Sequence, residues 1–276
     1  MLSREARFIA LFVGFFMVLI LFGCAIFVAY AATGEDELPL PTEFKYYYET
    51  VGFKLSKAKA VICYFEPEDE SVRDRFWSEN WFNVTSNSMS EWKYRLYEKT
   101  YNGDWEFSYR FFMLHEHIGK SVADPLFNDC EVFVLFEKIS SENKLGQVSF
   151  DYSKSIRGYT IMTIWSQVEK EGGITIHFGE DGGTSKIEPK IIDIPTHNIG
   201  KIAQHEFGHV IGLGHQYGTM KGINSTSIMN QHLSTDGPNE DRFITDEDIE
   251  AVLFLHGTDG FGGWCDNVKY NYIIIP

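Results

Sequence analysis

The alternation of apolar and polar residues divides the chain into one long apolar run and a series of shorter segments. The run covers residues 8–30, and no charged residue lies between Arg7 and Glu35. Because a helix rises about 1.5 Å per residue, this run is long enough to cross the hydrocarbon core of a bilayer. We predict a transmembrane helix at 8–30 that acts as an uncleaved signal anchor. The alternative is a cleaved signal peptide, whose apolar region is normally about 7 to 15 residues long.

The charges that flank the apolar run predict its orientation. Arg4 and Arg7 precede it, and three acidic residues follow it at 35–37. Positive charge favours the cytoplasmic side, so we place residues 1–7 in the cytoplasm and everything after the run outside. The expected location is the cell membrane, with a single span, or the exterior if the segment is cleaved. Two prolines within 31–57 indicate a stalk between the membrane and the folded domain.

Beyond the stalk, the pattern predicts strands interrupted by helices. Apolar residues recur at helical spacing over 83–101, where Met89, Trp92 and Leu96 share one face. Short runs rich in β-branched and aromatic residues indicate strands at 58–65, 105–114, 130–136, 159–165, 174–178 and 187–194. This order predicts an α/β domain over 58–257. Residues 258–276 are interpreted as a C-terminal tail without an assigned role.

The charge balance narrows the range of partners. The chain has 276 residues, with 24 basic and 39 acidic side chains and a formal net charge of −15. A strongly acidic protein is a poor ligand for nucleic acid and for anionic membrane surfaces. We therefore expect no nucleic acid partner, and membrane association only through residues 8–30.

One eleven-residue segment, His-Glu-Phe-Gly-His-Val-Ile-Gly-Leu-Gly-His, has the spacing of a catalytic metal site. His205 and His209 are four residues apart, so a helix presents both imidazoles on one face. Glu206 lies beside the first of them, where it can reach a water on the metal without binding the metal itself. Gly212 lets the chain turn back and bring His215 to the same place. Three imidazoles with an open fourth position are typical of catalytic zinc.

This segment resembles the zinc signature of the metzincin metallopeptidases, His-Glu-x-x-His-x-x-Gly-x-x-His. Two later stretches strengthen the resemblance. Ser-Ile-Met-Asn around Met229 is similar to the methionine turn, and the stretch from Ile244 through Asp248 to Leu-His-Gly at 255–257 is similar to the C-terminal helix of the matrixin branch. The resemblance implies that Met229 packs beneath the ligands without binding the metal. It also implies that Asp248 bonds to the methionine turn, although a simple helix-start acid is the alternative.

The resemblance implies a function as well as a ligand set. It implies one zinc ion on His205, His209 and His215, and an endopeptidase that hydrolyses extracytoplasmic protein or peptide substrates. Glu206 would serve as general base and then as general acid. The alternative is a catalytically silent zinc-containing module that binds partners at the cell surface. The intact Glu206 favours the enzyme.

The same resemblance implies a metzincin-like architecture. This is a mixed, mostly parallel twisted sheet with an edge strand over the zinc cleft, an active-site helix and a C-terminal helix. In such folds the substrate adds to the edge as a further strand. The candidate edge strand comprises Gly173, Ile174, Thr175, Ile176 and His177, with an ordinary strand as the alternative.

The cysteines and the glycine-rich acidic loops leave alternatives open. Cys63, Cys130 and Cys265 lie on the exported side, where disulfides form. Cys63 and Cys130 occupy strand-like runs that would be neighbours in a metzincin sheet, which favours that pair over two free core cysteines. Loops at 179–183 and 236–241 are candidates for calcium, with plain solvated loops as the alternative.

Two residues depart from the family pattern. Gln216 follows the third histidine where matrixins commonly have serine, and Asn230 follows the methionine where an aromatic is usual. These departures bear on subsite specificity and leave the expected reaction class unchanged.

Overall fold

The computed structural model describes residues 46–50, 55, 59–101, 103–140, 144–151, 159–170, 174–176, 184–186, 190–218, 226–230, 242–261 and 272–275. No helix within these ranges has both the length and the apolar character needed to cross a membrane. Several predicted features lie outside the described residues: the cytoplasmic and transmembrane segments at 1–30, Gly173, His177, Cys265 and the candidate calcium loops at 179–183 and 236–241.

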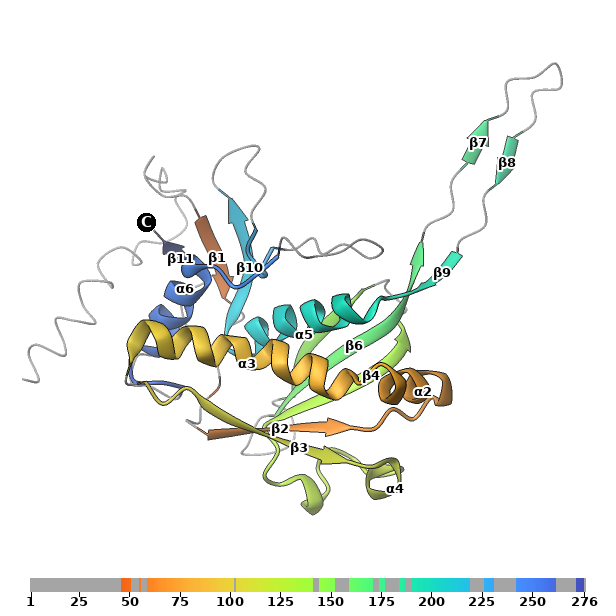
Figure 1. The fold of residues 1–276 in the computed structure, drawn as a ribbon, viewed down its shortest axis with the longest axis horizontal. Helices are drawn as coiled ribbons and strands as arrows, with labels where there is room; N and C mark the ends of the chain where they lie inside the picture. The colour runs from red at the N-terminus through yellow and green to blue at the C-terminus, as the bar shows by residue number, and fades with distance from the viewer. Residues whose placement is uncertain are drawn as a thin grey trace, which may run out of the picture. The chain divides into compact units, whose positions relative to one another are not determined.

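A six-stranded sheet lies at the centre of the fold (Figure 1). Its main path has the order β3-β2-β4-β6-β5, and β9 also pairs with β6. The parallel strands are β2 (Lys59–Phe65), β3 (Glu106–Phe112), β4 (Val132–Ile139) and β6 (Tyr159–Lys170). Two strands run antiparallel to β6, namely β5 (Gly146–Asp151) and β9 (Lys190–Asp193). The expectation of an α/β domain with a mixed, mostly parallel sheet is confirmed.

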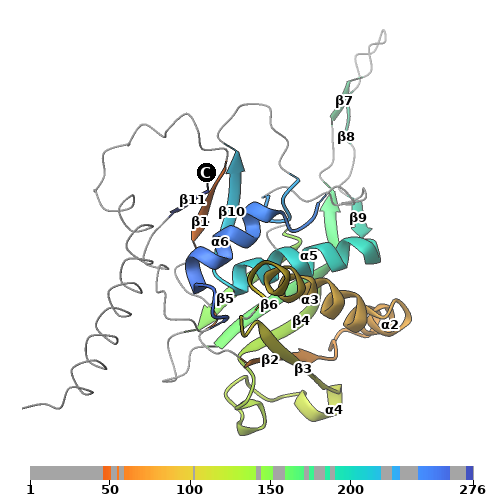
Figure 2. The same cartoon turned by 60° about the vertical axis from the view of Figure 1, so that its left-hand side comes forward.

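Two long helices, α3 (Trp81–Thr100) and α5 (Thr196–Val210), cover one face of this sheet (Figures 1 and 2). Side chains alternate along β2, so that Ile62 and Tyr64 point into the main core beneath these helices. The helices also bond directly, because the Trp92 indole donates to the Gln204 carbonyl at 2.9 Å. Helix α5 is thus a buried helix, held between α3 and the sheet.

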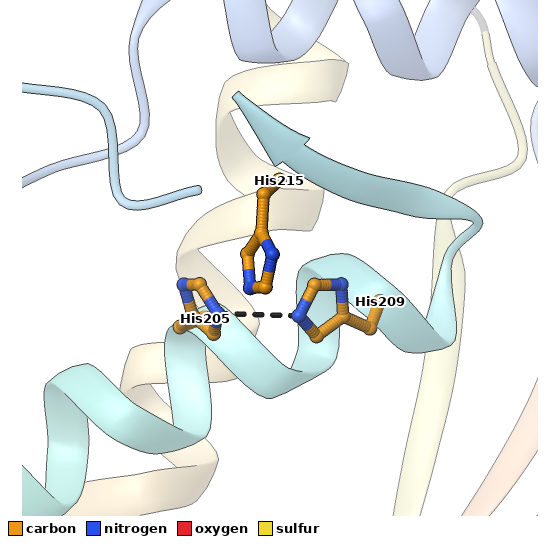
Figure 3. A group of neighbouring side chains, drawn as sticks. All are labelled: His205, His209 and His215. Atoms are coloured by element: carbon orange, nitrogen blue, oxygen red, sulfur yellow. Dashed lines mark hydrogen bonds between the residues drawn. The ribbon is translucent and has the colours of Figure 1, made fainter. Parts of the chain in front are cut away.

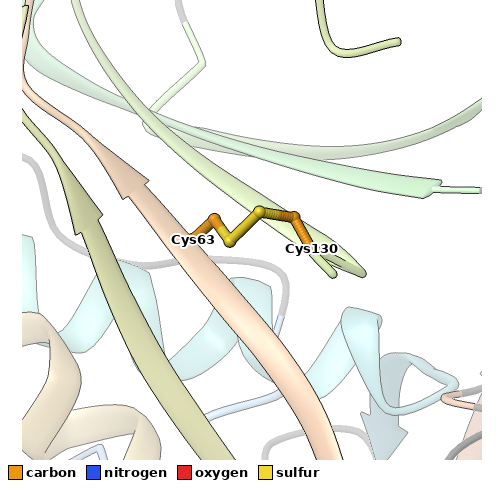
Figure 4. Close-up of a disulfide and its surroundings, with 2 residues drawn as sticks. All are labelled: Cys63 and Cys130. Atoms are coloured by element: carbon orange, nitrogen blue, oxygen red, sulfur yellow. A yellow bond between two sulfur atoms is a disulfide. The ribbon is translucent and has the colours of Figure 1, made fainter. Parts of the chain in front are cut away.

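The other face of the sheet carries a smaller aromatic core and the disulfide (Figure 4). Cys63 on β2 bonds to Cys130 just before β4, with the two Cα atoms 5.7 Å apart. The pairing favoured from the sequence is confirmed. The cluster also contains Phe65, Phe112, Phe127 and Phe133, and a short helix α4 (Leu114–His117) and a 3-10 turn η1 (Pro125–Phe127) lie in this part of the chain.

Helix α2 (Glu70–Ser78) follows β2 and has no counterpart in the sequence prediction. It begins at Asp69, whose carboxylate accepts a hydrogen bond from the Val72 amide at 3.1 Å. Its buried side chains are only Val72 and Phe76, too few to give a visible helical periodicity. The later helix α6 (Asp246–His256) was expected from the matrixin-like C-terminal segment.

A second sheet, of three strands, corrects the predicted domain limits. Its order is β10-β1-β11, formed by β10 (Leu213–Gly218), β1 (Tyr46–Thr50) and β11 (Tyr272–Ile275), all antiparallel. Part of the predicted stalk at 31–57 is therefore a central strand, and part of the predicted tail at 258–276 is an edge strand. The folded domain extends beyond 58–257 at both ends. Short strands of this kind are defined by partners far away in the sequence, which a local pattern does not reveal.

The described part of the candidate edge strand does not belong to the central sheet. Ile174, Thr175 and Ile176 form β7, which pairs with β8 (Thr184–Lys186) in a two-stranded sheet separate from the central one. Strands that are close in sequence commonly pair with each other, and these two do so across a short connection. Among the described strands, the one at the end of the central path beside α5 is β5.

Candidate metal centre

Helix α5 carries the first half of the site. Its apolar residues recur at helical spacing and are buried, namely Ile199, Ile202, Ala203, Phe207 and Val210. Packing on this face fixes the rotation of the helix and therefore the direction of the His205 and His209 side chains. The helix ends at Val210, and the following turn leads into β10.

The third histidine arrives through a reversal of the chain at Gly212. This glycine has φ of 108°, in the left-handed region that other residues avoid. The turn that the motif requires is therefore present where the sequence indicated. Gly214 is required by space, because a Cβ there would lie 2.6 Å from the Glu49 backbone of β1. A side chain at Gly214 would push the two strands apart.

The three predicted ligands converge (Figure 3). One ligand nitrogen from each of His205, His209 and His215 lies within 4.8 Å of the others. Ring centroids are 4.7 Å apart for His205 and His209, 5.0 Å for His209 and His215, and 5.3 Å for His205 and His215. The His205 side chain is buried, whereas His209 and His215 are partly exposed, so the cluster opens towards solvent on one side.

Backbone carbonyls fix the tautomers of two of these imidazoles. His205 Nδ1 lies 2.6 Å from the Ile228 carbonyl oxygen, and His209 Nδ1 lies 2.7 Å from the Leu213 carbonyl oxygen. A carbonyl only accepts, so each Nδ1 carries the hydrogen and each Nε2 has a free lone pair. This is the usual arrangement around a metal, where an outer hydrogen bond orients the ligand ring.

The short distance between the Nε2 atoms of His205 and His209 favours a cation beside them. They are 3.2 Å apart, and with both hydrogens on Nδ1 there is no proton left for them to share. Two facing lone pairs at this distance repel each other unless a positive charge lies between or beside them. The donor set of three imidazole nitrogens suits zinc.

Burial keeps two of the imidazoles, those of His205 and His209, in the neutral state that binds metal. Desolvation holds the pKa of His205 well below its usual range, and His209 adds to this effect. Desolvation likewise lowers the pKa of His209 to about 4, against the opposing hydrogen bond to Leu213. Protons therefore do not compete for these nitrogens near neutral pH.

Glu206 follows His205 on α5, and its carboxylate is not one of the three candidate metal ligands. Its side chain is 5% exposed, and burial raises the pKa of its carboxyl to about 8, with the charge of Lys144 acting in the opposite direction. The carboxylate points at the first residue of β5, because a Cβ on Gly146 would lie 2.5 Å from Glu206 Oε1. The carboxylate therefore lies against the start of strand β5.

Met229 packs against helix α5 at Gly208, the residue that precedes His209. It is fully buried, and its thioether packs against Gly208, where any side chain would collide with it. Its backbone amide donates to Ser227 Oγ at 2.9 Å, and Ser227 Oγ donates to Asp248 Oδ1 at 2.6 Å. The expected bond between Asp248 and this turn is therefore present. Burial raises the pKa of Asp248 to about 6, against these hydrogen bonds.

Several residues that shape the site were not identified from the sequence. Tyr48 donates to Asp248 Oδ1 at 2.7 Å and accepts from Gln216 Nε2 at 2.7 Å. The aromatic run at 46–48 was the available signal, because three consecutive tyrosines are typical of a strand rather than of a stalk. Strand β5 also carried a signal, since Val148 and Phe150 alternate with polar neighbours.

The chain was compared with protein-family models and with curated proteins, and neither comparison gives a match.

Proposed function

We propose that this protein is a zinc-dependent metalloendopeptidase that hydrolyses peptide bonds in extracytoplasmic proteins. The observation that carries the proposal is the convergence of three imidazoles, two of them held neutral by burial, with a buried carboxylate on the residue that follows His205. The imidazoles would hold the metal on one side and leave a solvent-facing position open.

Each residue has a distinct role in this proposal. His205, His209 and His215 would hold zinc, which supplies Lewis acidity by lowering the pKa of water and polarising the scissile carbonyl. Glu206 accepts the proton from the attacking water and then donates it to the leaving amine. Its apolar surroundings suit both steps, since they make the protonated carboxyl accessible near neutral pH.

Strand β5 is the surface along which we propose that the substrate binds. It is the terminal strand on the main path of the central sheet, as far as the chain is described, and its first residue touches Glu206. A peptide added to this edge by backbone hydrogen bonds would bring a carbonyl next to the carboxylate. This role replaces the one that the sequence suggested for residues 173–177.

The test uses residues 35–276, with Glu206→Gln as the matched control. We expect one zinc per chain in both proteins, cleavage of a mixed peptide library by the parent, and a loss of roughly 10²- to 10⁴-fold in the variant. One zinc without cleavage by either protein would favour the silent cell-surface binding module. A folded parent that takes up no zinc would refute the proposal.

A further inference from the structure

The strand that carries the third histidine, β10, belongs to a sheet whose other strands are far from it in the sequence. Within the described part of the chain, the strand partner of β10 is β1, and the other partner of β1 is β11 (Figures 1 and 2). In this pairing Tyr48 lies opposite Gln216, the residue next to His215, and Thr50 lies opposite Leu213. The position of His215 therefore depends on a strand near the N-terminus.

Strand β10 also orients a second imidazole. The Leu213 carbonyl oxygen, at the start of β10, accepts the hydrogen of His209 Nδ1 at 2.7 Å. A displacement of β10 would move His215 directly and release the ring of His209 at the same time. Two of the three imidazoles are thus set by the same strand.

The Tyr48 hydroxyl joins β10 to the parts of the fold that lie beneath the metal centre. It accepts from the Gln216 side chain and donates to Asp248, each at 2.7 Å. Asp248 in turn accepts from Ser227 Oγ, which holds the Met229 amide. The backbone amide of Gln216 donates to the Met229 carbonyl at 2.8 Å, which closes the network.

Every side chain in this network is shielded from water. Tyr48, Asp248 and Ser227 are 0% exposed, and Gln216 is 2% exposed. Water cannot easily replace a missing partner there, so the loss of one hydroxyl leaves polar groups to find new bonds by moving. The movement available to them is a shift of β10 against α6 and the methionine turn.

We propose that Tyr48 is a positioning residue for the metal centre, and that β1 is part of the apparatus that holds the ligands. This inference rests on the proposed function, because it assumes that the three histidines hold zinc. Tyr48 acts through Gln216 and Asp248 and touches neither the metal nor the substrate. The segment expected to be a plain stalk would thereby control how well the site binds its ion.

The experiment compares Tyr48→Phe with Tyr64→Phe in the zinc-binding protein. Tyr64 lies on strand β2 and is equally buried. Its hydroxyl bonds to Thr85 Oγ1 of α3 at 2.9 Å, and Thr85 Oγ1 donates onward to the Trp81 carbonyl oxygen of the same helix. Both variants lose one buried hydroxyl and keep the ring. Zinc affinity is measured by competition with a chelator, and the ligand geometry by the visible spectrum of the Co²⁺-loaded protein.

We expect Tyr48→Phe to raise the zinc Kd roughly 10- to 100-fold and to change the Co²⁺ spectrum. Tyr64→Phe should keep the zinc Kd within about twofold of the parent value, since it affects stability without reaching the ligands. If Tyr48→Phe does not fold, Gln216→Met removes the amide that donates to the hydroxyl and should weaken zinc binding in the same way.

Three outcomes would overturn the inference. The first is an unchanged zinc Kd in Tyr48→Phe, or in Gln216→Met if that variant is used. The second is an equal loss of affinity in Tyr64→Phe, which would reveal a general effect of stability. The third is a folded parent without zinc affinity, and only this outcome also refutes the proposed function.

Discussion

Two glycines allow a side chain from another element to approach the backbone more closely than any other residue would permit. Gly208 leaves room for the Met229 thioether under α5, and Gly146 leaves room for the Glu206 carboxylate beside β5. Neither has a positive φ, so both are required by space and not by backbone conformation. Replacing the two glycines by alanine should have different effects. The Met229 side chain is enclosed in the core, whereas the Glu206 carboxylate is at the end of a flexible side chain and can move.

At Gly146 this difference gives a prediction. Gly146→Ala places a methyl group 2.5 Å from Glu206 Oε1, so the carboxylate must swing away from the position from which it would accept a proton. We expect kcat/KM to fall roughly 10- to 100-fold, because small displacements of a catalytic group are costly, while the zinc content stays the same. Peptide cleavage and metal analysis on the same sample measure the two effects.

The control for Gly146→Ala lies away from the proposed substrate edge. Ser121→Ala changes an exposed residue between α4 and η1 and should leave both cleavage and zinc content near the parent values. Full activity in Gly146→Ala would contradict the placement of Glu206 against β5.

At the scale of elements, the central sheet separates the disulfide from the metal centre. Residues alternate along β2, so that Cys63 and Phe65 face the small aromatic core while Ile62 and Tyr64 face the helices. The disulfide joins β2 to the beginning of β4 across 67 residues of sequence. Such a closure stabilises the fold mainly by restricting the unfolded chain.

The double variant Cys63→Ala/Cys130→Ala should therefore lose stability without losing metal. We expect the free energy of unfolding to fall by about 2 to 5 kcal/mol, measured by urea denaturation. Zinc content should be unchanged under conditions in which the variant is folded. A reductant should lower the urea midpoint of the parent and leave that of the variant where it is; a further decrease in the variant would show that another bond contributes.

The elements that could be predicted share a physical property. The parallel strands, α3 and α5 are each long enough for their apolar period to exceed local noise, so their existence follows from the sequence alone. Strands β1, β10 and β11 span only a few residues each, and β10 begins within the motif and continues to Gly218. Their stability comes from pairing between residues far apart in the sequence, such as Thr50 with Leu213 and Tyr46 with Ile275, which no local pattern encodes.

At the scale of the whole molecule, the three histidines of the candidate metal centre come from two separate parts of the fold. His205 and His209 belong to α5, which packs on the central sheet, and His215 belongs to the three-stranded sheet. An ion bound by all three imidazoles would link these parts in the folded protein and would not bind the unfolded chain in this way. Binding of this kind stabilises the whole protein by mass action.

Removal of zinc should lower the melting temperature. At free zinc of 100 times its Kd the stabilisation is about 2.7 kcal/mol. For a domain of this size that corresponds to a decrease of roughly 5 to 10 °C when a chelator is added, measured by scanning calorimetry. His209→Ala should show no comparable response to the chelator; an equal shift in that variant would mean that the stabilising ion binds elsewhere.

The sequence by itself determined the chemistry of the candidate site. The spacing of His205 and His209 requires only a helix, and Gly212 requires only a tight turn, so local geometry was enough to predict that the three imidazoles meet. The same holds for the apolar strands and for α3, whose periods are local properties.

Only the tertiary structure decided how the site is held and where a substrate could lie. Three features depend on which distant segments meet. They are the position of β5 at the end of the central sheet, the close approach of side chains at Gly146 and Gly208, and the burial of Tyr48. Residue type and spacing describe a segment against its immediate neighbours. Packing and buried hydrogen bonds arise between segments, and that is why part of the predicted stalk is a strand paired with the strand that carries His215.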